Sequence, residues 1–428
     1  MSFQDTFCTS PWIHMHITNQ GEYSFCRGAG VVDGLMGVNI RDVDPIDFFQ
    51  NHMSKVRKSL IDGEAYTHCK HCYLQDTHNK VSLRKKQLLK TGVIEQNFYK
   101  SLRSSPWYKE INHSASNNGH TSVLPVDWQI DLGNTCNSAC VFCLPKYSSR
   151  LALELKKLGF IEQVPQTTWC DDPELLDKLI HTLKSTPNLR YLHFLGGETI
   201  ITPAFKTMLK KLVASGNTSA TIGFTTNLTV WDEEIIQLLQ NFGGVNVGLS
   251  IETLHCVNDY LRYPLNTTQA KKLLDQWVHV SKQNNWLASI RTTPSVFSVL
   301  HVIDMYNYAL SNNTSLESCN FMSEPSFMRP SVLPKEYRDQ AIQKLQTWVD
   351  TNSIEGKERV VNIRNPNTVQ ELLSQDVQSY INYLKNQPDE SHLLPQLVNY
   401  IKRLEQNRNN SILDYLPEYE NFLRSAGY

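Results

Sequence analysis

Residues 131–146 read DLGNTCNSACVFCLPK and carry three cysteines in a Cys-x3-Cys-x2-Cys arrangement: Cys136, Cys140 and Cys143. They follow the apolar-alternating run VDWQIDL (126–132), which predicts a β-strand. Three thiolates in one short loop can bind three irons of a cubane [4Fe–4S] cluster, which leaves the fourth iron without a protein ligand. Proteins that use such clusters only to carry electrons usually have four cysteine ligands. The loop therefore indicates a reactive cluster with an open position, as in catalytic zinc sites.

The loop and its strand-then-loop setting resemble those of the radical S-adenosylmethionine (SAM) superfamily. The resemblance implies that Cys136, Cys140 and Cys143 hold a [4Fe–4S] cluster. It also implies that SAM chelates the open iron through its amino and carboxylate groups. A zinc loop, or three unrelated cysteines, is the alternative interpretation. Zinc loops more often pair one Cys-x2-Cys with a second.

Composition limits the classes of function that the chain can serve. The 428 residues suffice for two or three domains, and 41 basic and 42 acidic residues give a net charge of −1. No block of like charge supports nucleic-acid or membrane-surface binding. The start lacks a signal-peptide pattern, and no apolar run approaches the roughly 20 residues of a membrane helix. Ten cysteines in such a chain favour metal ligation in a reducing cytoplasm.

Three zones follow one another along the chain. Residues 1–120 carry four cysteines, and the polar stretch 112–122 is interpreted as a linker or surface loop. Residues 123–330 alternate strand-like and helical runs, and residues 331–428 are mostly helical and polar. Repeated β–α units predict an α/β fold with parallel strands and right-handed crossovers. The strands are expected at 126–132, 189–195, 220–226, 245–251, 286–293 and 317–322.

Six such units fit the open, partial (β/α)6 barrel of the radical SAM superfamily, and a doubly wound sheet is the alternative. Both architectures place their active sites at the carboxyl ends of the strands. Alternation in the first strand places Asp127, Gln129 and Asp131 on one face, and Ser289 and Arg291 share a face further on. Because helices cover the outside of a barrel, these polar faces are expected to line its interior. A half-solvated antiparallel sheet is the alternative.

The second predicted strand ends in FLGGETIITP, which resembles the Gly-Gly-Glu motif of the superfamily. In that motif the backbone and the carboxylate receive the ammonium group of SAM. Gly196 and Gly197 would allow a ligand to approach the backbone closely, and Glu198 would accept hydrogen bonds from a cation.

Further SAM-binding candidates follow the later strands, and each is assigned by resemblance. Asn227 ends FTTN like the superfamily's Thr-Asn, and Ser250 and Glu252 stand where Ser-x-Asp-Gly is common, with Thr253 replacing the glycine. Surface ion pairs and loop packing are the alternative roles. The remaining candidates are Arg262, from an Asp-x-x-Arg pattern with Asp259, Arg291 for the SAM carboxylate, and Phe142 beside the adenine.

Four cysteines near the N-terminus resemble the auxiliary-cluster elements of SPASM/twitch domains. Cys8 and Cys26 flank Gly21 in a Cys-x12-Gly-x4-Cys pattern, and Cys69 and Cys72 form a later Cys-x2-Cys. Gly21 lies in the turn of a predicted β-hairpin. The family usually places this module after the barrel, and here it comes first. The resemblance implies an auxiliary [4Fe–4S] cluster, whereas zinc on the same four thiolates is the alternative.

The remaining cysteines, Cys170, Cys256 and Cys319, are expected to be buried free thiols. The resemblance implies a radical SAM enzyme that acts on a peptide or protein side chain, with a ferredoxin or flavodoxin as electron donor. A small-metabolite substrate is one alternative, and a non-catalytic iron–sulfur or zinc scaffold is another. No nucleic-acid or membrane partner is expected. The sequence assigns no catalytic acid or base.

Overall fold

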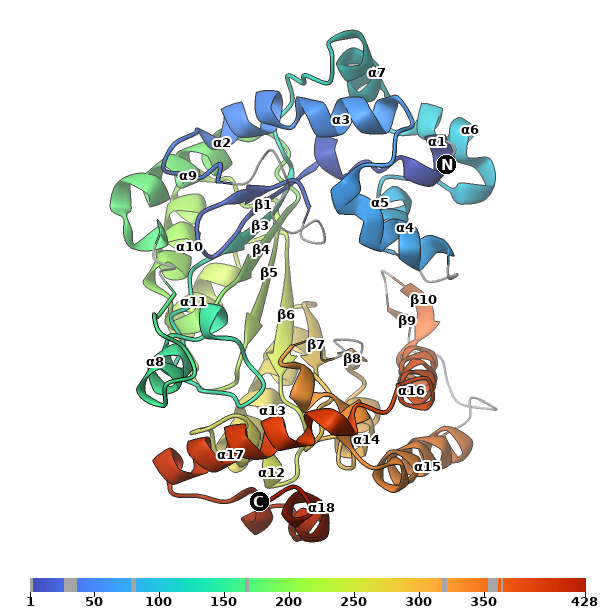
Figure 1. Cartoon of the computed structure of the whole chain (residues 1–428). Helices are drawn as coiled ribbons and strands as arrows, with labels where there is room; N and C mark the ends of the chain where they lie inside the picture. Colours follow the sequence, from blue (N-terminus) through green and yellow to red (C-terminus); the bar gives the residue numbers. More distant parts are fainter. Residues whose placement is uncertain are drawn as a thin grey trace. The chain divides into compact units, whose positions relative to one another are not determined.

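The computed structural model describes residues 3–26, 37–77, 82–165, 169–317, 322, 324–352, 361–362 and 365–428 (Figure 1). The chain forms two compact units. The first comprises Met1–Asn134, Gln166–Gly223 and Glu234–Gly244, and the second comprises Thr135–Pro165, Phe224–Glu233 and Val245–Tyr428. The three zones expected from the sequence stay a prediction.

The first unit contains a sheet in which β2 (Tyr23–Ser24), β1 (His14–Ile17), β3 (Asp127–Asp131) and β4 (Tyr191–Leu195) are neighbours in that order. β1 and β2 form the predicted antiparallel hairpin, and β1 also runs parallel to β3. Gly21 turns the hairpin with a φ of +84°, and a Cβ there would lie 2.9 Å from Asn39 Oδ1. Glycine is therefore required at this turn. The N-terminal segment thus contributes a strand to the parallel sheet.

Helices and loops complete the first unit. Asp172 caps α9 by accepting hydrogen bonds from the N–H groups of Glu174 and Leu175, and α9 and α10 bury apolar faces. The expected linker at 112–122 is partly helical, because α7 continues to Ser116 and buries Ile111 and Ser114. The helices are α1 (Phe3–Thr6), α2 (Pro45–Asp47), α3 (Ser54–Ile61), α4 (Lys70–Thr77), α5 (Leu83–Lys90), α6 (Phe98–Ser104), α7 (Tyr108–Ser116), α9 (Pro173–Ser185) and α10 (Pro203–Ser215).

The second unit contains the parallel strands β6 (Gly244–Ser250), β7 (Leu287–Arg291) and β8 (Ser315–Glu317), with helices between them. β8 begins two residues before the predicted 317–322, and residues 318–321 lie outside the described part of the chain. The predicted C-terminal helices are present. The helices are α8 (Ser149–Lys157), α12 (Val257–Leu261), α13 (Thr267–Gln283), α14 (Ile303–Ser311), α15 (Lys335–Thr351), α16 (Val369–Lys385), α17 (Leu394–Arg408) and α18 (Glu420–Arg424).

The boundary between the units crosses β5 (Thr221–Thr226) and the start of α11 (Glu233–Leu239). A separate antiparallel pair, β9 (Val361–Asn362) and β10 (Asn365–Thr368), belongs to the second unit. Parallel strands alternating with helices confirm the predicted α/β class.

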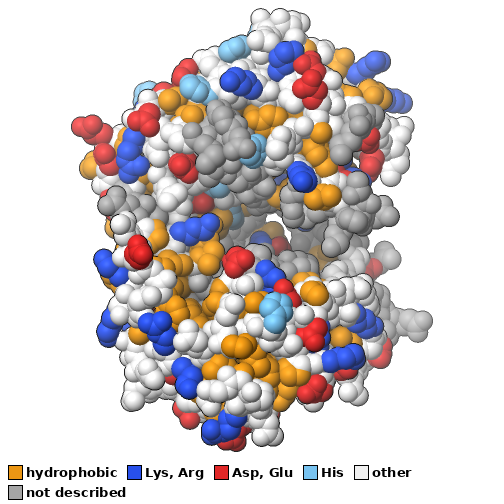
Figure 2. All heavy atoms as spheres, in the orientation of Figure 1, with side chains coloured by type: hydrophobic (Ala, Val, Ile, Leu, Met, Phe, Trp, Pro, Cys, Tyr) orange, Lys and Arg blue, Asp and Glu red, His pale blue; other side chains and the backbone are white. Residues whose placement is uncertain are grey.

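The composition predicted no block of like charge on the surface and no membrane-spanning helix. Figure 2 shows acidic and basic side chains interspersed on the face drawn. Among the helices that the structure describes, none combines the length and apolarity required to cross a bilayer.

Candidate functional site

The cysteine loop of the second unit is fixed by backbone hydrogen bonds. Ala139 N–H donates to the carbonyl of Tyr263 at 2.7 Å, and Val141 N–H donates to the carbonyl of Leu261 at 2.9 Å. Tyr400 of α17 donates its hydroxyl to the Val141 carbonyl at 3.1 Å. The backbone on both sides of Cys140 is therefore held by partners more than 100 residues away.

Arg408, at the end of α17, ties this loop to α8. Its guanidinium forms a bidentate ion pair with Glu154, with N–O distances of 2.9 and 2.6 Å, and donates to the Ala139 carbonyl at 2.7 Å. The Arg408 side chain is 1% exposed and the Glu154 side chain 9%. A buried pair of this kind is costly to break, because removing one partner leaves the other charge unpaired.

The three thiols of the loop share one environment. Burial raises the pKa of Cys143, and the neighbouring Cys140 and Cys136 raise it further. Burial also raises the pKa of Cys140, while Arg262 acts in the opposite direction. Soft thiolates suit iron–sulfur clusters, and iron would supply the positive charge that keeps them deprotonated. The donor set therefore fits the predicted cluster.

Asn227 of the β5–α11 loop lies against the same segment. Its amide Nδ2 donates to Asn137 Oδ1 at 2.9 Å and to Ser138 Oγ at 3.1 Å, and lies 3.8 Å from Cys136 Sγ. Asn227 thus helps to position the cysteine loop. Its contact with SAM stays a prediction.

Glu252, Arg262 and Phe142 are in contact beside the cysteines. The Glu252 carboxylate is fully buried and accepts hydrogen bonds from Arg262 and from the Thr293 N–H. The Arg262 guanidinium lies 5.5 Å from the centre of the Phe142 ring. Arg262 Nε is buried and has no hydrogen-bond partner among the described residues. Glu252 therefore holds Arg262, and Arg262 keeps one donor for a ligand.

Ser250 and Arg291 are register partners at the ends of β6 and β7. Arg291 forms an ion pair with Glu317 of β8, and both side chains are partly exposed. This contact is the surface ion pair that the sequence analysis gave as the alternative role. SAM binding by Ser250 and Arg291 stays a prediction.

The predicted Gly-Gly-Glu turn lies in the first unit, directly after β4. Gly196 has a φ of +139°, and a Cβ there would lie 2.7 Å from the Gly133 carbonyl oxygen, so glycine is required. Glu198 is buried, and its carboxylate accepts a hydrogen bond from the Ile200 N–H at 3.2 Å. The ligand contacts expected of Gly196, Gly197 and Glu198 stay predictions.

The four N-terminal cysteines line one cavity of about 120 Å³ in the first unit. Burial raises the pKa of Cys69 to about 12, with Cys26 and Cys72 adding to the shift. Burial likewise raises the pKa of Cys8, and Cys26 and Cys69 raise it further. The structure thus brings together thiols from three separate segments. Their donor set fits the expected cluster as well as zinc, and the metal stays a prediction.

A polar wall of the same cavity was not identified as a site from the sequence. β1, β3 and β4 place His14, Asp127 and Tyr191 in one register row, and Gln129 and His193 line the cavity from the next row. The sequence did place Asp127 and Gln129 on one face. It could not show that the cysteines lie against that face.

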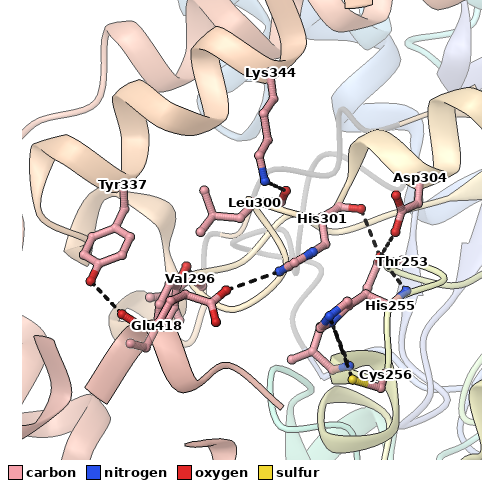
Figure 3. A network of polar contacts seen from close by, with 12 residues as sticks. Thr253, His255, Cys256, Val296, Leu300, His301, Asp304, Tyr337, Lys344 and Glu418 are labelled. Carbon is pink, nitrogen blue, oxygen red and sulfur yellow. Dashed lines mark hydrogen bonds and ion pairs between the residues drawn. The ribbon is translucent and has the colours of Figure 1, made fainter. Parts of the chain in front are cut away.

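A histidine pair follows β6 and β7 and was also missed (Figure 3). The rings of His255 and His301 stack with centres 3.9 Å apart and an interplanar angle of 15°. Thr253 Oγ1 donates to the His301 carbonyl at 2.9 Å and accepts from the His255 N–H at 3.0 Å. Burial lowers the pKa of His301, and His255 and Lys344 lower it further.

The remaining cysteines only partly follow expectation. Cys170 is buried, as expected, whereas Cys256 is exposed, because it precedes α12 on a surface turn. Cys319 lies outside the described residues. As the described side chains stand, no three His, Cys, Asp or Glu residues form a group placed to hold a single metal ion.

Comparison with known families gives a match over part of the chain. Residues 130–276, about a third of the chain, match the model of the radical SAM superfamily. No curated protein matches the sequence.

Solved structures share only distant similarity with this chain. Streptococcus suis SuiB bound to S-adenosylmethionine is 14% identical, with a TM-score of 0.39, and the match covers 70% of this chain and 64% of SuiB. Native anSMEcpe with bound AdoMet is 17% identical, with a TM-score of 0.38, over 52% of this chain and 60% of that protein. The chain thus covers less than two thirds of the length of either protein.

Proposed function

We propose that this chain, whose residues 130–276 form a radical SAM superfamily domain, is a radical SAM enzyme that cleaves SAM reductively. Cys136, Cys140 and Cys143 would hold a [4Fe–4S] cluster. That cluster would supply the electron for cleavage of SAM to methionine and a 5′-deoxyadenosyl radical, which would take a hydrogen atom from the substrate. The observation that supports the proposal is the set of three thiols in one short loop, buried at Cys140 and partly buried at Cys136 and Cys143. A cubane cluster bound by these three thiols would keep one iron open for SAM.

The residues around the loop bind and orient SAM in this proposal. Arg262 offers its unpaired Nε–H to the SAM carboxylate, and Glu252 fixes the direction of that donor. Phe142, stacked beside Arg262, offers a flat apolar surface to the adenine. Gly196, Gly197 and Glu198 receive the SAM ammonium, and Asn227, Ser250 and Arg291 are further polar contacts.

The substrate that we propose is a peptide or protein side chain, and the electron donor is a ferredoxin or flavodoxin in the cytoplasm. An auxiliary [4Fe–4S] cluster on Cys8, Cys26, Cys69 and Cys72 would accept an electron from the substrate radical. A zinc ion there would leave SAM cleavage intact and remove this electron transfer.

Release of 5′-deoxyadenosine tests the proposal. Anaerobically reconstituted protein is reduced with dithionite in the presence of SAM, and the product is measured by chromatography. We expect release by the wild type and by Cys256→Ala, which removes an exposed thiol outside the loop. We expect none from the triple variant Cys136→Ala, Cys140→Ala and Cys143→Ala. Cluster-loaded wild type that releases no product would favour a non-catalytic scaffold.

A further inference from the structure

Two buried acceptors face the N-terminal cavity without a hydrogen bond. Asp127 and Gln129 of β3 both line the cavity, and the residues are 7% and 5% exposed. In the described part of the chain, Asp127 Oδ1 and Gln129 Oε1 accept no hydrogen bond. Arg190 Nε lies 4.0 Å from Asp127 Oδ1, beyond hydrogen-bond length. Buried acceptors are normally satisfied, so these two indicate a missing donor.

The orientation of the Gln129 amide is set by its neighbours. Its Nε2 donates to Asp131 Oδ1 at 3.1 Å and also lies 3.1 Å from His16 Nε2, which in turn lies 3.1 Å from Asp131 Oδ2. Turning the amide over would place its oxygen against the Asp131 carboxylate, which cannot donate when ionised. The amide oxygen of Gln129 therefore remains the group without a partner.

The cysteine wall cannot supply the missing donor. Ionised thiolates are acceptors, and so are the sulfides of an iron–sulfur cluster held by them. A metal site on Cys8, Cys26, Cys69 and Cys72 therefore leaves Asp127 and Gln129 unsatisfied. Among the described lining residues, Gln87 Nε2 is a further buried atom without a hydrogen-bond partner, and a molecule with N–H or O–H groups would satisfy Asp127 and Gln129.

The floor beside these acceptors is flat and aromatic. The rings of Tyr191 and His193 on β4 are nearly parallel, at 13°, with centres 5.7 Å apart. Lys90 Nζ lies 5.7 Å from the centre of the Tyr191 ring, so this surface already accepts a cation. The cavity of about 120 Å³ is lined by the four cysteines and by these polar residues together, and it is too small for a folded peptide segment.

We infer that this cavity binds a planar N–H donor group, a guanidinium or a carboxamide, between the four cysteines and the Asp127–Gln129 pair. The group would be the end of a substrate side chain or of a small molecule, which makes the cavity a substrate-binding subsite of the enzyme proposed above. That the bound molecule is a substrate rests on the proposed function. Binding of the molecule in the cavity does not require SAM cleavage.

Binding of two probes tests the inference. Methylguanidinium and, separately, propionamide are titrated calorimetrically into the full-length, anaerobically reconstituted protein. We expect saturable binding of one or both in the wild type. Asp127→Asn should weaken methylguanidinium binding about tenfold or more, because a charge-assisted bond is lost. Gln129→Leu should weaken the binding of both probes. If methylguanidinium binds more tightly than propionamide, the group that the cavity recognises is a cationic guanidinium. If the two probes bind equally, that group is a neutral carboxamide.

The matched control is Asp177→Asn, which removes an exposed carboxylate of α9 that pairs with Lys211. It should bind both probes as the wild type does. The inference is overturned by metal-loaded wild type that binds neither probe, or by Asp127→Asn and Gln129→Leu proteins that fold and bind both unchanged. Probe binding without release of 5′-deoxyadenosine would support the inference and contradict the proposed function. Release of 5′-deoxyadenosine without probe binding would support the proposed function and contradict the inference.

Discussion

The three cysteines of the central loop lie within eight residues of one another, whereas the four N-terminal cysteines come from segments spread over residues 8–72. Three thiols in the central loop would leave a cubane cluster one ligand short, whereas the four N-terminal thiols would ligate all four irons of a separate cluster. Both sites nevertheless use the same support. In each, a buried arginine pairs with a carboxylate and donates to a carbonyl directly before a cysteine. The two predicted sites therefore differ in the number of thiol ligands and not in the arginine that supports them.

The supporting arginines provide the largest expected effects. Arg408 binds Glu154 and the Ala139 carbonyl, and Arg84 binds Asp76 and the Phe7 carbonyl. Substituting either arginine by alanine leaves a buried carboxylate without its ion-pair partner. The free energy of unfolding should therefore fall by about 3–5 kcal/mol. Denaturant titration measures this loss.

Iron content of the same variants tests whether each arginine supports only its own site. Arg408→Ala should lose iron from the central loop, and Arg84→Ala should lose metal from the N-terminal cavity. Arg424→Ala, which removes an exposed pair with Glu420, should cost no more than about 0.5 kcal/mol. Equal metal loss from both sites in either variant would show that the frameworks are not separate.

Two Arg–Glu pairs at the ends of β6 and β7 give an intermediate effect. Glu252→Gln weakens the buried partner of Arg262 and should lower the free energy of unfolding by about 1–3 kcal/mol. Glu317→Gln weakens the partly exposed partner of Arg291 and should cost at most about 1 kcal/mol. Denaturant titration of both variants measures the two losses in free energy of unfolding. A larger loss from Glu317→Gln would contradict the structural ranking of the two pairs.

The smallest expected effect is pH dependence at His301. Its pKa is lowered in the folded protein, chiefly by burial, so below about pH 6.5 the unfolded chain binds more protons than the folded one. Stability should therefore fall as the pH drops through this range. His301→Gln should flatten the dependence, whereas His279→Gln, on the exposed face of α13, should not. If the slope of stability against pH is unchanged in His301→Gln, His301 is not the cause of the pH dependence.

The sequence predicted those features whose residues are close together in the chain. The cysteine loop, the Gly21 hairpin and the strand order along the chain depend on local spacing and alternation, and the structure contains each element. Arg408 and Glu154 are separated by 254 positions, so no local pattern could pair them. The cavity beside Asp127 was missed for the same reason, since its cysteines reach the sheet only through tertiary packing. The linker expected at 112–122 was partly wrong, because the apolar contact of Ile111 extends a helix into a polar stretch.

The central claim is that the loop of Cys136, Cys140 and Cys143 leaves an iron open for SAM while the N-terminal set is closed. Electron paramagnetic resonance of two dithionite-reduced variants, each with and without SAM, tests it most directly. One variant lacks the three loop cysteines, and the other has Cys8, Cys26, Cys69 and Cys72 replaced by alanine. We predict that SAM changes the spectrum of the second variant and leaves that of the first unaltered. A SAM-dependent change confined to the first variant would contradict the account.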